Sequence, residues 1–331
     1  MVITMKLAVI GSGGWGTAIA LLLASKGNDV YLWSWQQEET DRLNRDRENK
    51  EFLPGVAFPD NITCTHNMEL CVKDAELIVT AVPSPATRTT AKQLAPYVAE
   101  GQKLLNISKG LEGSLRLSQV YQEEIPQADI SVMSGPSHAE EVSRGLPTTN
   151  VISSQTTETA RKLQEIFMTE VFRVYTSDDI IGVELGGSLK NVIALCAGIS
   201  DGIGYGDNTK AALMTRGLWE MARLGKAMGA KEETFMGLSG MGDLIVTCTS
   251  MHSRNRRAGI LIGKGKTLQE TLDEVHMVVE GVNTAKAAYN LSVQYRVDMP
   301  IIEEAYRILY RNKSVQDAVS DLMTREKRSE R

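Results

Sequence analysis

Two adjacent polar residues interrupt a long apolar segment in the second half of the chain. Lys190 and Asn191 follow Glu184 within the run ELGGSLKNVIALCA. A charge is expensive in apolar surroundings unless it has a partner or a function. Burial would disfavour the ammonium form of Lys190, lower its pKa and make it a usable proton acceptor near neutral pH. The spacing equally allows Lys190 to lie on a solvated polar stripe beside Glu184, and both interpretations stay open.

A second group of polar residues has the chemistry of a phosphate clamp. Ser253, Arg254 and Asn255 come in sequence at the expected start of a helix. Such a start can hold an anion, although SRNRR can equally be an ordinary basic helix start. The glycine-rich segment GLSGMGD delivers Asp243 shortly before it, and Thr247 follows within the next turn of chain.

Two further candidates stand at the expected carboxyl ends of strands. Lys109, beside Gly110, ends the segment NISKG and would point into the crevice where ligands bind in α/β folds, unless it is a solvated surface lysine. Ser137 follows Gly135 in SGPSHAEE and is expected to cap the next helix. The N–H groups of that helix start could hold an anion, or Ser137 could be a cap and nothing more.

The element that must position a cofactor is a strand, a glycine-rich turn and a helix near the N-terminus. An apolar run from Leu7 to Ile10 meets Gly11-x-Gly13-x-x-Gly16, and a helical pattern continues to Gly27. The first glycine permits the tight turn, the second lets backbone N–H groups approach a pyrophosphate, and the third brings the helix close to its strand. The alternative of a purely structural turn is less favoured, because a second strand follows Gly27.

The end of that second strand leaves the choice of dinucleotide open. A site for NAD usually has Asp or Glu there for the ribose 2′-hydroxyl, and a site for NADP usually has Arg or Lys. Ser34, Trp35 and Gln36 are neither, and Glu38 and Arg42 come later. Trp35 is expected either to stack on the adenosine or to pack in the core.

The surrounding pattern predicts an α/β domain followed by a helical one. Apolar strand-like runs at 30–33, 77–82, 103–107, 130–133, 149–153 and 172–175 alternate with helical patterns at 91–98, 115–124 and 160–167. This alternation is typical of a doubly wound, mainly parallel Rossmann-type sheet. After residue 177 long helical patterns take over, at 180–199, 210–228, 281–295, 301–309 and 314–323. We therefore predict domains at 1–177 and 178–331.

Composition excludes several classes of protein. The 331 residues carry a net charge of −5, which gives no support for nucleic acid or an anionic membrane as a partner. No uncharged apolar run is long enough to span a bilayer, and the start of the chain does not resemble a signal peptide. The four cysteines form no CxxC pair and the four histidines no metal-ligand spacing, which predicts reduced thiols, a cytoplasmic location and no metal site.

The ordered set of motifs resembles one enzyme family. GSGGWGTA, SKG, GPSHAEEV, ELGGSLKNVIALCAGISDG with GDNTKAAL, GLSGMGDL and SRNR are similar to those of bacterial-type NAD(P)-dependent glycerol-3-phosphate dehydrogenases, from about Lys6 to Tyr310. The resemblance implies a Rossmann domain and a helical substrate domain like the C-terminal domain of 6-phosphogluconate dehydrogenase. It also implies oxidation of glycerol 3-phosphate to dihydroxyacetone phosphate and the reverse, which supplies phospholipid synthesis, and a homodimer.

The same resemblance implies roles for the candidates. Lys190 would accept the proton of the C2 hydroxyl, so that no metal is needed. Residues implied to orient the substrate or this lysine are Lys109, Asn191, Asp243 and Thr247. Residues implied to hold or border the substrate are Gly135, Ser137, Ser253, Arg254 and Asn255. Residues expected to contact NAD or NADP are Gly11, Ser12, Gly13, Gly14, Trp15, Gly16, Trp35, Lys109, Ala139, Arg254, Val278 and Glu280.

One departure and several rival functions remain. The family often has Arg or His where this chain has Trp35 and Gln36, which puts its usual NADP preference in doubt. A β-hydroxyacid or 6-phosphogluconate type dehydrogenase would share the architecture. A dinucleotide-binding redox sensor would not need Lys190 or Arg254. A methyltransferase would favour a GxGxG turn and an acid after the second strand, which this chain lacks.

Overall fold

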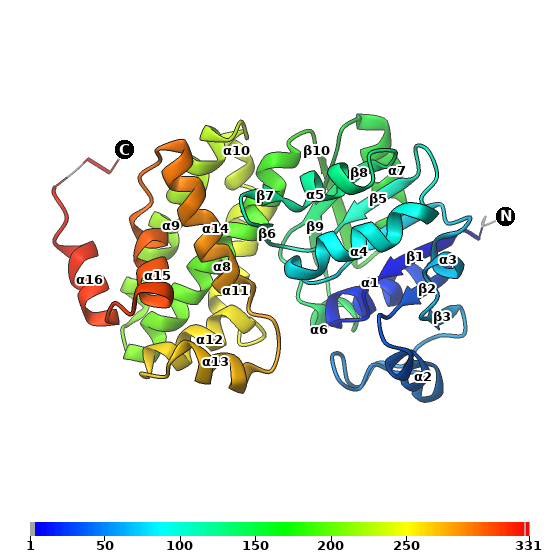
Figure 1. Cartoon of the computed structure of the whole chain (residues 1–331), viewed down its shortest axis with the longest axis horizontal. Helices are drawn as coiled ribbons and strands as arrows, with labels where there is room; N and C mark the ends of the chain where they lie inside the picture. The colour runs from blue at the N-terminus through cyan, green and yellow to red at the C-terminus, as the bar shows by residue number, and fades with distance from the viewer. Residues whose placement is uncertain (1–3, 328, 331) are drawn as a thin grey trace.

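The computed structural model describes residues 4–327 and 329–330, which form two lobes (Figure 1). The first lobe contains the main sheet and the N-terminal half of the chain, and the second consists of helices. The passage between them is short, since the last strand ends at Ser177 and the next helix begins at Ile180. The sequence predicts the domain boundary in this passage, at residues 177–178.

An eight-stranded sheet forms the core of the first lobe. Its order is β10-β9-β8-β5-β4-β1-β2-β3, and every neighbouring pair is parallel except β8 with β9. The strands are short apolar runs because a parallel sheet is buried on both faces. The strands of this sheet are β1 (Lys6–Ile10), β2 (Asp29–Trp33), β3 (Ile62–Thr65), β4 (Leu77–Thr80), β5 (Lys103–Asn106), β8 (Asp129–Ser134), β9 (Thr148–Ser154) and β10 (Phe172–Ser177).

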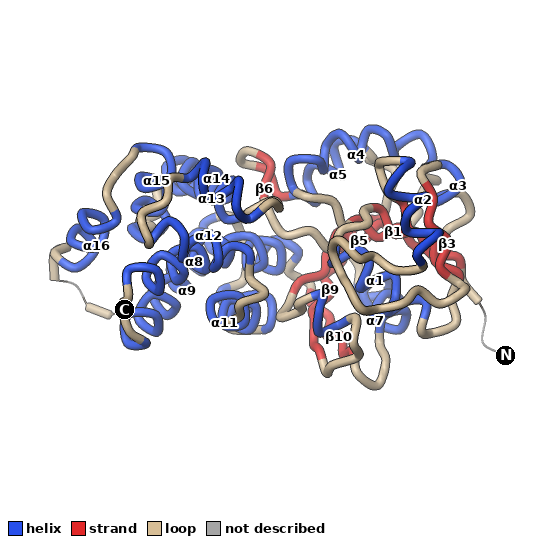
Figure 2. Tube along the Cα trace, turned by 90° about the horizontal axis from the view of Figure 1, so that it is seen from below, coloured by secondary structure: helices blue, strands red, loops and turns tan. Residues whose placement is uncertain are grey.

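Helices cover both faces of this sheet, as Figure 2 shows. Leu7 and Val9 of β1 belong to the core under α1 and α7, whereas Ala8 and Ile10 belong to the core under α4 and α5. This alternation follows from the two-residue period of a strand. The helices of the lobe are α1 (Gly14–Ala24), α2 (Gln37–Asp46), α3 (Met68–Val72), α4 (Thr87–Leu94), α5 (Leu117–Glu124), α6 (Ala139–Val142) and α7 (Thr157–Phe167), with 3-10 turns η1 (Ser84–Ala86) and η2 (Ala95–Tyr97).

The predicted fold class is confirmed, and several local elements differ from the prediction. Strand β3 was not predicted, because ITCT is too short and too polar to stand out by periodicity. The small hairpin β6 (Leu111–Glu112) and β7 (Leu115–Arg116) was not predicted either. The helix expected at 91–98 instead begins at Thr87 and gives way to a 3-10 turn at Ala95.

Among its described residues, the second lobe has only helices as regular elements. Its axis is α8 (Ile180–Ile203), whose N-terminus is capped by Asp179, which accepts a hydrogen bond from Gly182 N at 2.8 Å. The other elements are α9 (Asp207–Ala227), α10 (Glu232–Phe235), the π-helical turn η3 (Leu238–Gly242), α11 (Asp243–Thr249), α12 (Arg254–Gly263), α13 (Leu268–Val275), α14 (Glu280–Tyr295), α15 (Pro300–Arg311) and α16 (Val315–Met323). Helix α16 lies at the far end of the lobe (Figure 1).

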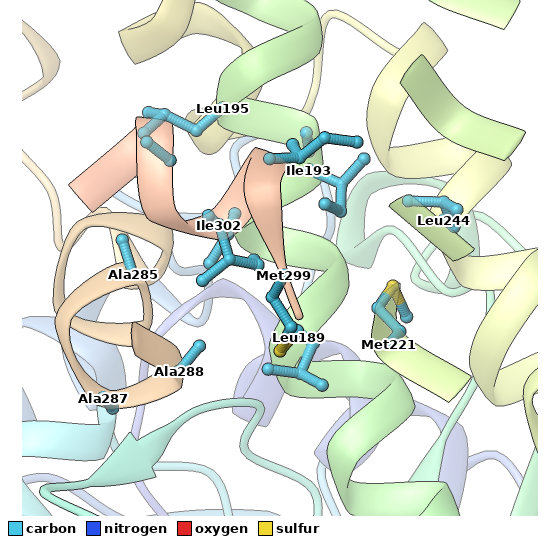
Figure 3. Packing of buried hydrophobic residues seen from close by; sticks show 14 of the residues in the cluster. Leu189, Ile193, Leu195, Met221, Leu244, Ala285, Ala287, Ala288, Met299 and Ile302 are labelled. Carbon is cyan, nitrogen blue, oxygen red and sulfur yellow. The ribbon is translucent and has the colours of Figure 1, made fainter. Parts of the chain in front are cut away.

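Helix α8 is buried along most of its length because neighbouring helices pack around it. Leu189 and Ile193 of α8 pack with Met221 of α9 and Ile302 of α15 in one buried cluster (Figure 3). By length and composition α8 could cross a bilayer, yet 83% of its most apolar window is buried within the protein. It is the one such helix in the described part of the chain, and it serves as the core of a lobe.

Two polar side chains on α8 fasten the lobes together. The Glu184 carboxylate accepts hydrogen bonds from Arg116 Nη1 at 2.7 Å and from the backbone N–H of Ser118 at 2.8 Å. One turn further, Ser188 Oγ donates to the Gly110 carbonyl at 3.0 Å. These contacts fix α8 against the segments that follow β5 and so set the position of Lys190, which lies on another face of the helix.

Candidate active site

A buried carboxylate joins two lysines from different parts of the fold. Asp243 Oδ1 accepts a hydrogen bond from Lys190 Nζ at 2.5 Å, and Asp243 Oδ2 accepts one from Lys109 Nζ at 2.7 Å. Lys190 comes from α8, Asp243 opens α11 after the π-helical turn, and Lys109 follows β5. The structure thus brings together three residues that the sequence singled out separately.

Lys190 lies in the interior and not on a solvated stripe. Its relative exposure is 5%, and Glu184, its alternative polar neighbour, is turned to Arg116. Burial lowers the pKa of Lys190 to about 8, opposed by the attraction of Asp243 and helped by repulsion from Lys109. Its Nζ also donates to Thr247 Oγ1 at 2.6 Å. An amine that is fixed in position by hydrogen bonds and partly neutral near physiological pH can take up and return a proton.

Asp243 remains a carboxylate despite its burial. Burial alone would raise its pKa, but the charges of Lys109 and Lys190 outweigh that effect and hold the pKa of Asp243 below its usual value. Thr247 Oγ1 donates a hydrogen bond to the backbone carbonyl of Asp243, one helical turn earlier, at 2.6 Å. Asp243 therefore orients the lysine side chains and compensates their charge.

Lys109 is a partner within the site and not a free surface lysine. Only 17% of its side chain is exposed, and its Nζ also donates to the Gly135 carbonyl at 2.8 Å. Gly135 begins the loop after β8, so Lys109 ties that loop to Asp243. The glycine has φ +157°, a backbone conformation that L side chains rarely adopt, and a Cβ there would come within 2.8 Å of Asn150 Oδ1.

The prediction that Ser137 caps a helix is wrong. The residue at the N-cap of α6 is His138, and its side chain makes no capping hydrogen bond. Ser137 Oγ instead donates to Gly135 O at 3.0 Å and to Asn150 Oδ1 at 3.3 Å. The N-cap of α6 therefore lies one residue later than the sequence predicts. The Ser137 hydroxyl is not free to cap the helix because it bonds to Gly135 in the loop and to Asn150 on β9.

Two asparagines join the start of α12 to α8. Asn255 Nδ2 donates to Asn191 Oδ1 at 2.8 Å, and Asn255 Oδ1 accepts from Gly281 N at 2.8 Å. Both asparagines are buried, at 8% and 4% exposure. Their amides hold α8, α12 and α14 in register next to Lys190.

The side chains of Ser253 and Arg254 have different hydrogen-bond partners. Ser253 Oγ accepts from Arg256 N at 3.2 Å, as the N-cap of α12. The guanidinium of Arg254 turns back from the helix start and donates to the Val278 carbonyl at 3.2 Å. Burial lowers the pKa of Arg254, and the carboxylates of Glu280 and Glu140 oppose this effect. Its remaining N–H groups are suited to a phosphate or carboxylate.

The glycine-rich turn has the geometry that a pyrophosphate requires. Gly11 has φ +114°, and a Cβ at Gly16 would come within 1.9 Å of the Gly11 carbonyl, so both positions need glycine. A Cβ at Gly13 would meet nothing within 4 Å, which leaves open space beside the start of α1. No side chain caps this helix start, so its N–H groups are available to an anion.

The other predicted cofactor residues lie in three places. Trp15 and Ala139 pack near the turn, and the buried Trp15 Nε1 lacks a hydrogen-bond partner among the described residues. Val278 and Glu280 lie at the start of α14, where the Glu280 carboxylate accepts from Ser84 N at 3.0 Å and Ser84 Oγ at 2.5 Å. Trp35 is 68% exposed, which excludes packing in the core and leaves adenosine stacking as a prediction.

Sequence reasoning missed two residues beside these groups. Ser84 connects the first lobe to Glu280, and nothing in its local sequence distinguishes it. Glu39 on α2 is buried and accepts hydrogen bonds from Ser12 Oγ at 2.7 Å and from Ser34 Oγ at 2.5 Å. Its spacing of one helical turn from Leu43 places it on the inward face of α2 and could have revealed it.

Family models match both halves of the chain. The model described as the NAD-dependent glycerol-3-phosphate dehydrogenase N-terminus matches residues 6–160, and the one described as the C-terminus of that family matches residues 179–320. Together they cover both lobes and all the site residues described above.

Individual relatives match over almost their whole length. The chain is 56% identical to the NAD(P)+ glycerol-3-phosphate dehydrogenase of Moorella thermoacetica, covering 97% of this chain and 96% of that protein. It is 54% identical to that of Agathobacter rectalis, covering 98% and 97%. The crystal structure of glycerol-3-phosphate dehydrogenase from Coxiella burnetii aligns with a TM-score of 0.94 and 37% identity, covering 97% of this chain and 99% of that one.

Proposed function

The chain belongs to the NAD-dependent glycerol-3-phosphate dehydrogenase family, and from this premise we propose how its residues act. It is an NAD(P)-dependent oxidoreductase that interconverts sn-glycerol 3-phosphate and dihydroxyacetone phosphate. The observation that carries the assignment of roles is the buried contact of Lys190 with Asp243, 2.5 Å apart, at the junction of the two lobes.

Lys190 is the proton acceptor in this proposal. A bound nicotinamide dinucleotide would supply the hydride acceptor for C2 of glycerol 3-phosphate. The neutral amine of Lys190 takes the proton from the C2 hydroxyl as the carbonyl forms. In the reverse direction the Lys190 ammonium returns that proton to the ketone oxygen. The lowered pKa of Lys190, about 8, supports both roles because both protonation states are accessible near neutral pH.

Asp243, Lys109 and Thr247 position this lysine. The Asp243 carboxylate stabilises the ammonium form and fixes the direction of the Lys190 side chain through its 2.5 Å hydrogen bond. Lys109 opposes the first effect by like-charge repulsion, and Thr247 supplies a second acceptor at 2.6 Å. Burial together with these two charges sets the pKa of Lys190.

Arg254 binds the phosphate of the substrate in this proposal. Arg254 is the first residue of α12, and Asn255 and Asn191 hold that helix start against α8. Ser253 lies beside Arg254, and the loop with Gly135 and Ser137 borders the substrate. Fixing the phosphate end positions C2 for reaction and lowers the entropic part of the barrier.

The residues present fit a dinucleotide. Open space at Gly13, the uncapped start of α1 and the unpartnered Trp15 Nε1 all support a bound pyrophosphate and its neighbouring groups. The chain would hold the dinucleotide along Gly11–Gly16 and against Ala139, Val278 and Glu280. No step requires a metal in this scheme, since Lys190 moves the proton.

We further propose a cytoplasmic homodimer whose product supplies phospholipid synthesis. All four cysteines are free, which supports a reducing compartment. Gel filtration of the purified protein with light scattering tests the dimer, and fractionation of cells that produce the protein tests the location. A monomer, or recovery with the membranes, would contradict these proposals.

A direct assay tests the reaction. The purified chain is mixed with NADH or NADPH and dihydroxyacetone phosphate, and consumption of reduced cofactor is followed by absorbance. Oxidation of the cofactor by dihydroxyacetone phosphate, with none by β-keto acids, is expected. Turnover with hydroxyacids or 6-phosphogluconate alone would instead favour the rival dehydrogenases.

A further inference from the structure

A buried glutamate lies between the two elements that bind the adenosine half of a dinucleotide. Glu39 on α2 is 7% exposed, and its carboxylate accepts from Ser12 Oγ at 2.7 Å and from Ser34 Oγ at 2.5 Å. Ser12 belongs to the glycine-rich turn, and Ser34 follows directly after β2. A carboxylate is seldom buried without a specific reason.

This location is where a Rossmann fold selects its dinucleotide. An acid at the end of the second strand binds the ribose 2′-hydroxyl of NAD, whereas a cation there accommodates the 2′-phosphate of NADP. The turn and the end of β2 are adjacent here, because Gly11 N donates to the Trp33 carbonyl at 3.0 Å. Glu39 reaches back from the following helix and brings a carboxylate to the edge that Ser34, Trp35 and Gln36 leave without an acid.

The cations near α2 have other partners. Among the described residues, neither a lysine nor an arginine forms an ion pair with Glu39. Arg42 pairs with Glu51 at 2.7 Å, Arg45 pairs with Asp46 at 3.0 Å, and Arg47 donates to the Ile62 carbonyl at 2.9 Å. The groups that do contact Glu39 are neutral hydroxyls.

We propose that Glu39 makes the dinucleotide site selective for NAD(H) over NADP(H). A ribose 2′-phosphate carries roughly two negative charges at neutral pH and would meet a carboxylate that has no ion-pair partner among the described residues, in a region of low dielectric. A ribose 2′-hydroxyl carries no charge, and each carboxylate oxygen retains a lone pair that can accept its proton. Selectivity therefore arises from repulsion of the wrong ligand as well as from a contact with the right one.

The rival explanation is that Glu39 only anchors α2 to the turn. In that case its removal would weaken both dinucleotides equally by loosening the turn. The two explanations differ in the ratio of affinities for ligands that differ only in the 2′-phosphate. The inference rests on the proposed function, since it takes the glycine-rich turn as a dinucleotide site.

The test is titration calorimetry of the full chain with ADP-ribose and with 2′-phospho-ADP-ribose. We expect wild type to bind ADP-ribose at least about tenfold more tightly. Glu39→Gln, which removes the charge but keeps the shape, is expected to reduce that preference about tenfold. Glu38→Gln is the matched control, because it removes an exposed charge from the same turn of α2, and it should change the ratio less than about twofold.

Equal affinity of wild type for the two ligands would overturn the inference, as would an unchanged ratio in Glu39→Gln. A second variant, Glu39→Leu with Ser34→Ala, removes the same charge together with one hydroxyl partner and should show the same loss of preference. Because these titrations contain no substrate, they are independent of the reaction, which turnover with dihydroxyacetone phosphate tests separately.

Discussion

Lys190 Nζ and Asp243 Oδ1 lie 2.5 Å apart, in side chains that are 6% and 1% exposed. A buried ion pair of this kind has little access to solvent, so the pKa of the amine depends on the charges around it. Asp243 raises that pKa, while burial and Lys109 lower it, to a net value of about 8. The pKa of Lys190 should therefore determine how the reaction rates depend on pH.

The pH dependence of the two reaction directions should be opposite. Oxidation of glycerol 3-phosphate needs neutral Lys190, so its kcat/KM is expected to rise with pH and level off above about 8. Reduction of dihydroxyacetone phosphate needs the ammonium form, so its kcat/KM should fall above the same pH. Initial rates in both directions across this range check the prediction. Profiles that bend in the same sense would remove Lys190 from the role of proton carrier.

Replacing Lys190 should affect chemistry and spare cofactor binding. Lys190→Ala is expected to lower kcat by roughly two to four decades, the usual contribution of a general acid–base group. Binding of NADH, measured by fluorescence titration, should change little. Lys92, an exposed lysine on α4, provides the matched control as Lys92→Ala. Near-normal turnover of Lys190→Ala would contradict the proposal.

Removing the charge of Lys109 or of Asp243 should move the pH profile in opposite directions. Without Lys109, Lys190 loses a like charge and its pKa rises, so Lys109→Met should shift the oxidation profile to higher pH. Without the Asp243 carboxylate, the ammonium of Lys190 loses its partner, so Asp243→Asn should shift it to lower pH. Both variants will also lose turnover, and the direction of each shift is the diagnostic result. Shifts of the same sign would show that the profile reports another group.

Arg254 should control substrate saturation. Arg254→Ala is expected to raise the KM for dihydroxyacetone phosphate about tenfold to a hundredfold, the equivalent of one charge-assisted contact with a phosphate. Arg257, an exposed arginine on the same helix, is the matched control as Arg257→Ala. Since Arg254 is also expected to contact the dinucleotide, the KM for NADH should be measured in parallel. An unchanged KM for dihydroxyacetone phosphate would exclude Arg254 from the phosphate site.

A buried glutamate in the helical lobe should make stability depend on pH. Glu220 accepts hydrogen bonds from the N–H groups of Ile301 and Ile302 at the start of α15, and burial raises its pKa to about 7. Between pH 4.5 and 7 the unfolded chain ionises this group while the folded one does not. The contribution of Glu220 to the free energy of unfolding therefore falls with rising pH, by an amount on the order of 3 kcal/mol.

Denaturant unfolding of wild type and Glu220→Gln at pH 5 and pH 8 checks this expectation. The variant should be less stable at low pH, because its amide leaves a donor unpaired, and its free energy of unfolding should vary less with pH. Glu233→Gln, at an exposed position, should retain the wild-type dependence. Parallel curves for wild type and Glu220→Gln would assign the dependence to other groups.

Local patterns in the sequence determined most of the fold. The turn from Gly11 to Gly16 needs glycine for reasons of backbone geometry. Apolar runs indicate buried strands, and apolar residues at helical spacing indicate helices packed on a core. The same rules identified Lys190 as a charge in an apolar helix. The order of the motifs then indicated the family and, with it, the reaction.

Only the tertiary structure decided which charges meet. Lys190, Lys109 and Asp243 are far apart in the chain, and the packing of α8 and η3 against the ends of the strands brings them within hydrogen-bonding distance. The same is true of Glu39, which belongs to α2 but contacts the turn and the end of β2. Periodicity describes one element at a time, whereas a pKa or a ligand preference depends on neighbours contributed by other elements, so these properties are fixed only when the chain has folded.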